Sequence, residues 1–305
     1  MADRRARLLH VPSVRVFDRL LPWALRLFWV GALVFGGNAI DGATAERSDA
    51  VGAVATWGAG AAWVIGVAAM AIPAVISLTA TRLVVPLSVP AAVIVWSFGA
   101  DPVQASLLLG FAAGATVLAL SGDIGRIFVQ ASAYGDEQRH LLRPPAAYLI
   151  AVMISWTVWA ACVLAGPLLL TTRSWVLGGL LSVAAAALGV WGWQRWHRLS
   201  RRWLVVVPVG LVVHDHLVLA ETVMLRRQEI AGVRLAPSGT EAADLTGPAA
   251  GHAIEISTVE PITAIFAATP KQPRGNAIHL TSCLVSPTRP GRALTSMADR
   301  RLPVG

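Results

Sequence analysis

RRWLVVVPVGLVVHDHLVLAETVMLRR, residues 201–227, decides how the last third of the chain folds. Its first apolar run, residues 203–213, has only eleven residues, whereas a helix needs about 20 apolar residues to cross a membrane. Pro208 and Gly210 interrupt this run, and both residue types disfavour helix. The polar HDH at 214–216 ends it, and a second apolar run with β-branched residues follows. Two apolar runs around a polar turn predict a β-hairpin, so we expect the start of a water-exposed sheet and no seventh membrane crossing.

Composition separates the chain into two parts. Of the 305 residues, 55% are hydrophobic and 14% are charged, whereas a soluble domain carries about 25% charged residues. All twelve tryptophans lie between Trp23 and Trp203, and 13 of the 25 basic residues follow residue 192. We therefore predict a membrane domain followed by a smaller soluble domain.

Six apolar segments precede the opening stretch, and each approaches or exceeds the length that crosses a hydrocarbon layer. They are residues 20–40, 53–78, 83–99, 103–120, 145–170 and 174–193. The predicted fold class is an α-helical transmembrane bundle of six spans followed by a small cytoplasmic β-rich domain of the α+β class. The predicted domains are a basic N-terminal segment (1–19), the six-helix transmembrane domain (20–193), a basic juxtamembrane linker (194–202) and the β-rich domain with a C-terminal helix (203–305).

Basic residues predict the orientation of the bundle. They are concentrated before the first span, in the loop 121–144 and after the sixth span at 194–203. Short loops rich in Arg and Lys stay on the cytoplasmic side of a membrane. We therefore expect a multi-pass protein of the cell (inner or plasma) membrane with both termini in the cytoplasm.

The predicted spans contain few groups that could carry chemistry. Arg26 is the only charged residue within them, and it lies near the cytoplasmic end of its helix. Charged groups in the middle of a membrane mark ion and proton pathways, so their absence argues against an ion-coupled transporter. The sequence also lacks the GxxxxGK(S/T), GxGxxG, HExxH and GxSxG motifs. We expect a protein that is not an enzyme and that binds no cofactor or metal.

Small residues are frequent in the spans, for example at 58–62, 110–114 and 184–192. Such positions let helices approach closely in lipid. Gly110 and Gly114 therefore suggest either a homo-oligomer interface or packing within one bundle.

The longest predicted cytoplasmic loop, 121–144, contains the amphipathic segment IGRIFVQ. This segment predicts a short interfacial helix with Ile124, Ile127 and Phe128 facing lipid. A dense polar cluster follows it and consists of Asp136, Glu137, Arg139, His140 and Arg143. We predict that the cluster is a docking point for the C-terminal domain or for anionic lipid; the alternative is a solvated connector.

A second basic cluster directly follows the last predicted span and consists of Arg195, Arg198, Arg201 and Arg202. Each basic residue at this position can contribute about 1 kcal/mol of attraction to anionic lipid. The cluster suggests contacts to lipid headgroups, and the alternative is the ordinary basic flank of a last span. Because orientation explains most of the basic excess, we expect membrane lipids and a protein partner, and no nucleic acid.

Further strands are predicted in the soluble domain at 229–237, 252–257, 263–269 and 277–286, with turn-rich loops at 238–251 and 270–276. Alternation in the first of them predicts that Ile230, Val233 and Leu235 lie in the core. A one-sided helix ends the chain and carries Leu294, Met297 and Ala298 on its apolar face.

His214 and His216 would face the same side of a strand, which is half of a possible metal site. Asp215 between them, at the tip of the predicted hairpin, favours turn chemistry instead. Cys162 and Cys283, the two cysteines, fall in different predicted domains and imply no disulfide.

The order of these elements resembles the small pleckstrin-homology-like domain of bacterial membrane proteins. The resemblance rests on RRWLVVVPVGLVVHDHLVL, a basic start followed by a hairpin, and on SPTRPGRALTSMADRR, a final strand leading into a helix. The whole chain is similar to actinobacterial six-helix membrane proteins with such a tail, a family that implies no particular activity.

We therefore expect a non-enzymatic integral membrane protein that anchors its β-rich domain for interaction with a protein partner or anionic lipid. The alternative is a membrane component of a transport or export system. A polar, water-accessible cavity between the helices would favour that alternative.

Overall fold

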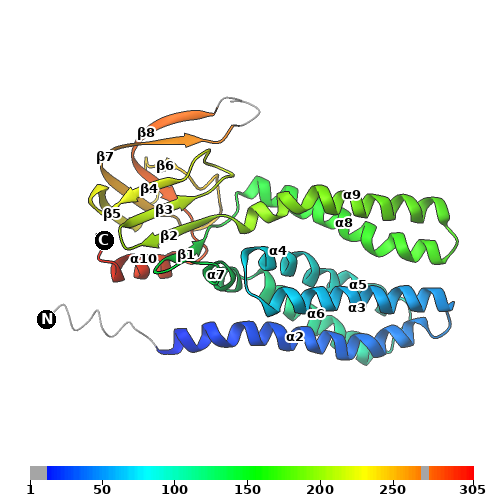
Figure 1. Cartoon of the computed structure of the whole chain (residues 1–305). Helices are drawn as coiled ribbons and strands as arrows, with labels where there is room; N and C mark the ends of the chain where they lie inside the picture. The colour runs from blue at the N-terminus through cyan, green and yellow to red at the C-terminus, as the bar shows by residue number, and fades with distance from the viewer. Residues whose placement is uncertain (1–11, 269–274) are drawn as a thin grey trace.

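The computed structural model describes residues 12–268 and 275–305. The long helices form an elongated bundle, and a β-rich domain lies at one end of it (Figure 1). Among the described residues, six helical segments are long and apolar enough to cross a membrane. They are α2 (Pro12–Thr44), α3 (Asp49–Ala71), α4 (Val75–Val84) with η2 (Val85–Leu87) and α5 (Ser88–Ser97), α6 (Pro102–Leu120), α8 (Ala146–Thr171) and α9 (Trp175–Ser200). The predicted fold class, a helical membrane bundle followed by a small β-rich domain, is confirmed.

Prolines set two of the helix boundaries. Pro73 lies between α3 and α4, so the second span ends at Ala71 and does not continue to residue 78 as expected. A proline lacks the N–H that would continue the helix and restricts the residue before it. Pro86 lies in η2, where the third span changes from α4 to α5. The last helix, α9, continues to Ser200, so residues expected in a linker lie on its last turns.

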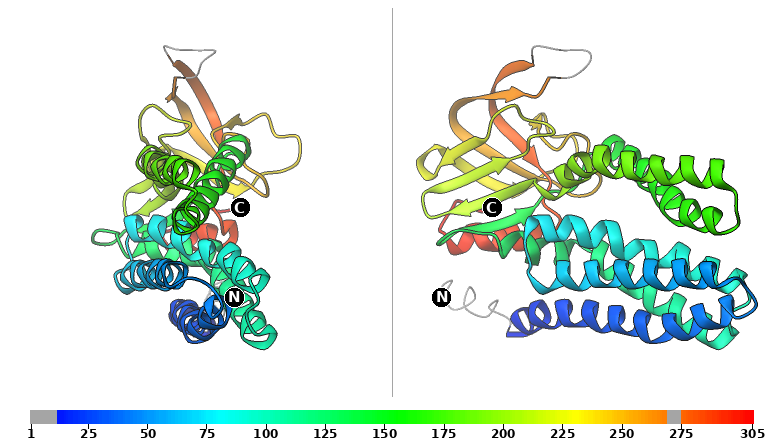
Figure 2. Two further views of the ribbon diagram at one scale, coloured as in Figure 1. Left: turned by 90° about the vertical axis from the view of Figure 1, so that its right-hand side faces the viewer. Right: turned by 45° about the vertical axis from the view of Figure 1, so that its right-hand side comes forward.

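α2 and α6 pack closely against each other. With α3, α4 and α5 they share one apolar core, which includes Leu25, Trp29 and Leu108. Gly114 of α6 packs directly on Phe28 of α2, because a Cβ at this glycine would lie 2.3 Å from the ring. The described residues of α8 and α9 lie outside that core, and these two helices pack mainly on each other as a hairpin beside the other spans (Figure 2).

The short helix α7 (Gly122–Gln130) lies across the end of the bundle that carries the β domain. Its predicted lipid-facing orientation is wrong: Ile124 and Phe128 are fully buried, and Ile127 packs partly buried against the same core. The Ser121 hydroxyl accepts from Ile124 N at 3.2 Å and starts the helix immediately after α6. The chain therefore turns back beneath the bundle, and the apolar face of α7 covers protein where lipid was expected.

The β domain contains two four-stranded sheets. The first has the order β1 (Gln138–Leu141), β2 (Trp203–Val207), β3 (Gly210–His214), β4 (Val223–Arg226), and all its neighbours are antiparallel. The second has the order β5 (Ile230–Leu235), β7 (Ile254–Phe266), β8 (Asn276–Val285), β6 (Ala243–Asp244), with only the β6–β8 pair parallel. The helix α10 (Pro290–Asp299) closes the domain, and Ala293 and Met297 bury its apolar face against both sheets.

The hairpin in the opening stretch is tighter than predicted. The run 203–213 forms two strands, β2 and β3, so the first turn lies at Pro208 and Val209 and not at 214–216. Gly210 permits the turn, because its φ is 154° and a Cβ there would lie 1.9 Å from Leu225 O. No other residue type fits this position without moving the backbone.

Three details of the later strands also differ from expectation. Leu235, the last residue of β5, is 51% exposed, whereas Ile230 and Val233 are buried on either side of a register shift between Ile230 and Gly232. The strands predicted at 252–257 and 263–269 are parts of one strand, β7, with a register shift between Ser257 and Ile262. On α10, Ala298 is exposed where burial was expected. Residue 269 and most of the predicted 270–276 loop lie outside the described residues.

Candidate functional site: the junction of the helices and the β domain

The first strand of the β domain comes from the membrane part of the chain. β1 lies in the loop between α7 and α8, outside the range 203–305 expected for the domain, and pairs along its whole length with β2. The Gln130 side chain at the end of α7 binds the backbone at the start of this strand. Its Oε1 accepts from Arg139 N at 2.7 Å, and its Nε2 donates to Glu137 O at 3.0 Å. Beyond β1, Leu142 N donates to Arg202 O and Arg143 N to Ser286 O. The β domain is therefore joined to the helices at two separate points of the chain.

A buried ion pair holds this junction together. Arg202 Nε donates to Asp215 Oδ1 at 2.6 Å, and Arg202 Nη2 donates to Asp215 Oδ2 at 2.5 Å. The two side chains are 1% and 0% exposed. Arg202 Nη1 also donates to Arg143 O at 2.6 Å. One guanidinium thus connects the end of α9, the chain after β1 and the segment after β3.

The HDH segment therefore has a structural role centred on its aspartate. Asp215 Oδ1 also accepts from Leu217 N at 3.2 Å, so the carboxylate orders the turn as well as binding Arg202. His214 stacks on Trp203, with ring centroids 5.0 Å apart, and its Nδ1 lies 3.1 Å from Thr222 Oγ1. Burial and the neighbouring His214 lower the pKa of His216 to about 4. Across residues 12–268 and 275–305, no group of three His, Cys, Asp or Glu side chains could hold a metal ion.

Three arginines around α10 pair with three aspartates of the membrane part. Arg289 Nη2 donates to Asp123 Oδ2 of α7 at 2.5 Å, and Arg292 Nη1 donates to Asp18 Oδ1 of α2 at 2.9 Å. Arg300 forms a two-pronged pair with Asp136, before β1. The Arg289 hydrogen bond lowers the pKa of Asp123, and the Arg300 hydrogen bond lowers that of Asp136. We call these three pairs the α10 contacts.

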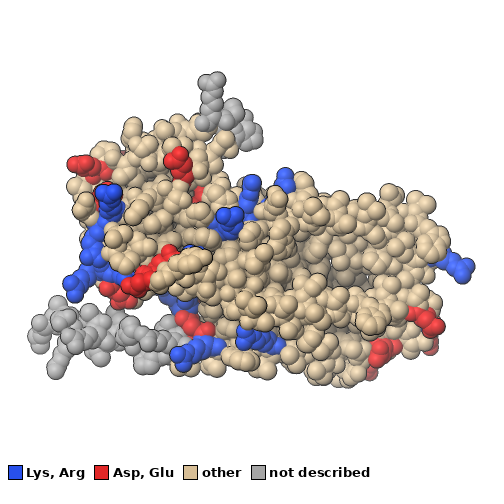
Figure 3. All heavy atoms as spheres, viewed as in Figure 1, with Lys and Arg blue, Asp and Glu red and all other residues tan. Residues whose placement is uncertain are grey.

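One of the α10 contacts is extended by an arginine from the membrane part. Arg126 Nη2 of α7 donates to Asp18 Oδ1 at 2.5 Å, the same oxygen that accepts from Arg292. Asp18 is thus shared by two arginines, one on each side of the junction. Burial, followed by the charge of Arg292, lowers the pKa of Arg126. In the space-filling view, charged side chains gather over the β domain, the junction and the far end of the bundle, and the helical surface between is nearly free of them (Figure 3).

His140 of β1 lies buried beside these charges. It is 6% exposed, and neither ring nitrogen has a hydrogen-bond partner. Burial, and then the positive charges of Arg126 and Arg292, lower the pKa of His140 to about 4. A proton on His140 would therefore place an unpaired positive charge beside Arg126 and Arg292.

The structure places all five residues of the predicted docking loop at this junction. Asp136 and His140 lie as described above. Glu137 and Arg139 pair with each other at 2.7 Å, and the Arg139 guanidinium lies 5.0 Å from the centre of the Trp203 ring. Arg143 Nη1 donates to the carbonyl oxygens of Ala250 and His252 in the β domain.

The four arginines predicted to contact lipid divide into two groups. Arg195, Arg198 and Arg201 are exposed near the end of α9. Arg202 is instead buried in the pair with Asp215 and is not available to a headgroup. Arg202 differs from the other three arginines because α9 ends at Ser200 and the chain then enters β2, which directs the Arg202 side chain into the β domain.

Gly110 and Gly114 also differ from each other. Gly114 is used for packing on Phe28 within the bundle, whereas a Cβ at Gly110 would meet no atom within 4 Å. The predicted homo-oligomer contact would therefore have to use Gly110 without Gly114.

Sequence reasoning missed Asp18, Asp123, Arg289 and Arg292 as members of the junction. The two residues of each pair lie far apart in the chain, by 166 positions for Asp123 and Arg289. The only local signal was the spacing of Arg289 and Arg292, which places both at the start of one helix.

Comparison of the chain with protein-family models, with curated proteins and with solved structures found no match. The resemblance to pleckstrin-homology-like domains and to actinobacterial membrane proteins therefore stays a prediction.

We expect Asp215→Ala to lower the free energy of unfolding by about 3–5 kcal/mol, because it leaves Arg202 charged and buried without a partner. Adding Arg202→Met should recover part of this loss. Unfolding of the purified protein in detergent measures both effects. Asp136→Ala, which removes a 77% exposed carboxylate, is the control and should cost far less. Equal losses for Asp215→Ala and Asp136→Ala would contradict the role of the buried pair.

Acidification should destabilise the junction through His140. Its folded-state pKa of about 4 lies below the ordinary histidine pKa of 6.5, so its contribution to stability is complete above pH 6.5 and is lost as the pH falls towards 4. His140→Phe removes the titration without removing a hydrogen bond. At pH 4.5 the free energy of unfolding of this variant should exceed that of the wild type by about 2 kcal/mol, with little difference at pH 8. His216 titrates in the same pH window, so the wild type and His140→Phe should both lose some stability on acidification. If the free energy of unfolding fell equally with pH in both proteins, His140 would not contribute.

Proposed function

We propose that this integral membrane protein holds its β domain at the cytoplasmic face of the membrane and binds anionic lipid headgroups there. The lipid site consists of Arg195, Arg198 and Arg201 at the end of α9. The observation that carries the proposal is that these three arginines are exposed, lie three residues apart at the helix end and have no carboxylate within ion-pair distance among the described residues.

The depth of the site in the membrane supports this proposal. The Arg195 guanidinium lies 3.8 Å from the centre of the Trp191 ring, one turn earlier on α9. Trp191 is itself half exposed, and tryptophans are enriched at the level of the headgroups. The Tyr148 hydroxyl of α8 donates to Arg195 O at 2.8 Å and so fixes the end of α9 against its partner helix. Arg198 and Arg201 lie further along, where phosphate groups would be reached.

The position of the site beside the junction gives lipid binding a consequence. Arg201 directly precedes Arg202, whose side chain holds β1, β2 and the HDH segment together. A headgroup bound at Arg198 and Arg201 would therefore brace the point where the β domain leaves the membrane. We propose that the domain is held in a fixed orientation there, which would present its outer surface to a protein partner.

The transport alternative receives less support. It requires a polar passage between the helices, whereas helices α2 to α6 of the described bundle share one apolar core, beside which Thr79 and Thr81 of α4 are also buried.

Thermal unfolding of the full chain in neutral detergent, with added phosphatidylglycerol or phosphatidylcholine, tests the lipid proposal. We expect phosphatidylglycerol to stabilise the wild type more than phosphatidylcholine does. In Arg198→Gln/Arg201→Gln the apparent affinity for phosphatidylglycerol should fall by about 30-fold, which corresponds to about 1 kcal/mol for each arginine.

The control is Arg226→Gln/Arg234→Gln, which removes the same charge from exposed positions on β4 and β5. It should keep the affinity of the wild type. Equal stabilisation of the wild type by both lipids, or the same loss of affinity for phosphatidylglycerol in both double variants, would contradict the proposal.

A further inference from the structure

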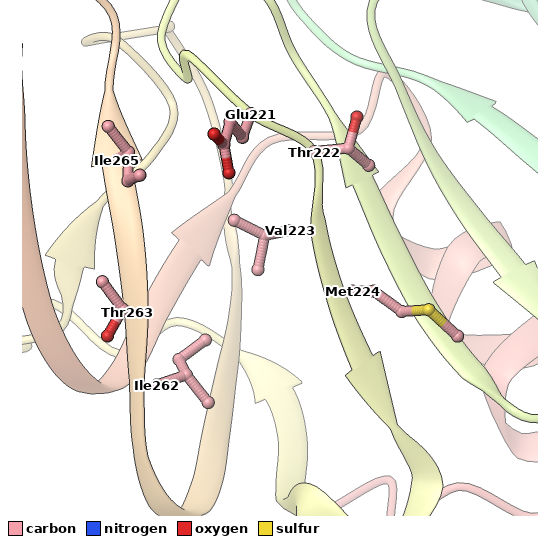
Figure 4. A pocket seen from close by; sticks show the side chains of 7 residues that line it. All are labelled: Glu221, Thr222, Val223, Met224, Ile262, Thr263 and Ile265. Carbon is pink, nitrogen blue, oxygen red and sulfur yellow. The ribbon is translucent and has the colours of Figure 1, made fainter.

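The two sheets of the β domain leave a cleft between β4 and the second half of β7. It has a volume of about 230 Å³ and is lined by Glu221, Thr222, Val223, Met224, Ile262, Thr263 and Ile265. Figure 4 shows these side chains on β7, on β4 and on the two residues that precede β4. The cleft belongs neither to the junction nor to the arginines of α9.

One wall of the cleft is the free edge of β4. This strand ends its sheet and pairs with β3 alone in the described part of the chain. Arg227 N donates to Val209 O, which makes these two residues a hydrogen-bonded pair of the β3–β4 ladder. Every second pair of this ladder is hydrogen-bonded, so the next such pairs are Leu225 with Leu211 and Val223 with Val213. In an antiparallel ladder the residues between bonded pairs direct their N–H and C=O groups to the opposite side. The backbone groups of Met224 therefore point to the free edge.

The other wall is an unpaired edge of β7. Its first half pairs with β5, but residues 262–264 pair only with β8, and Phe266 also forms a bridge with Leu219. Ile265 O accepts from Ala220 N, and Ala267 N donates to Val218 O, so odd-numbered residues here direct their backbone groups away from β8. By the same alternation the N–H and C=O groups of Thr263 point towards β4. The bond to Ala220 closes one end of the cleft.

The cleft also has a chemical preference. Val223, Ile262 and Ile265 supply apolar surface, and Met224 is 52% exposed at the rim. Glu221 contributes the only formal charge of the lining, and no basic group pairs with it among the residues that the structure describes. An occupant that contacts all of these groups needs an extended backbone, apolar side chains and a positive charge.

We propose that the cleft binds an extended, basic segment of a partner protein, which adds a strand between β4 and β7 and places a Lys or Arg at Glu221. Main-chain hydrogen bonds to Met224 and Thr263 would provide affinity, and the alternate side chains would provide selectivity. The unpaired edges explain why a partner strand fits, since free strand edges are templates for pairing. This inference is independent of lipid binding at α9.

The test uses the full chain in nanodiscs of phosphatidylcholine and phosphatidylglycerol and two fluorescent heptapeptides. Both peptides alternate Val and Thr, and they differ in a central Lys or Glu. We expect the wild type to prefer the Lys peptide, and Glu221→Lys to reverse the preference by about tenfold or more, because like charges repel across the contact. Fluorescence anisotropy measures both affinities.

Two further measurements locate the bound peptide. Hydrogen–deuterium exchange should slow at 222–224 and 262–265 when the Lys peptide binds. Met224→Pro should abolish binding, because it removes an N–H that faces the cleft while the bonds to β3 remain. The Lys peptide with its backbone nitrogens methylated is the matched control and should not bind.

Several results would overturn the proposal. One is the absence of binding by the wild type, and another is unchanged selectivity in Glu221→Lys. We expect this variant to fold as the wild type does, because the substituted side chain is exposed. Unchanged exchange at both strands would place the peptide elsewhere. A dimer in light scattering that Met224→Pro dissociates would show that a second copy of the chain, and not a basic partner, occupies the cleft.

Discussion

The pair of Arg202 and Asp215 is the constraint on which the arrangement of the two domains depends. Both side chains are fully buried, and the arginine also binds the carbonyl oxygen of Arg143. Burial of two charges is costly unless each is fully bonded, so this geometry tolerates little displacement. It fixes the exit of the chain from α9, the turn after β3 and the end of β1 in one place. The opening stretch of sequence therefore forms its own hairpin and also fastens it to the membrane domain.

This constraint makes the β domain part of the membrane assembly and not a tethered tail. β1 adds a strand from the loop after α7, and the α10 contacts bind α10 and its flanking residues to α2, α7 and the docking loop. The individual exposed pairs contribute little to stability, but together they specify the orientation of the domain. In our proposal, this orientation brings the arginines of α9 to the headgroups and leaves the cleft between β4 and β7 open to a partner.

The large features of this fold could be predicted from sequence, because they depend on local pattern. Apolar length predicts the spans, and Pro208 with Gly210 excludes a seventh helix. The junction could not be predicted in the same way. β1 reads QRHL, which has no apolar alternation, and its partner strand lies more than sixty residues later. α7 has the same amphipathic pattern whether its apolar face meets lipid or protein, so only the packing distinguishes the two. Arg202 and its exposed neighbours are likewise all arginines in one basic cluster, and only the position at which α9 ends determines that Arg202 is buried.

Amide hydrogen exchange across residues 138–143 tests most directly whether the membrane part supplies a strand to the β domain. In the intact protein in nanodiscs, these amides should exchange as slowly as those of β2, and Asp215→Ala should accelerate both segments together. Rapid exchange at 138–143 beside a protected β2 would contradict the account, because the loop would then be a free connector.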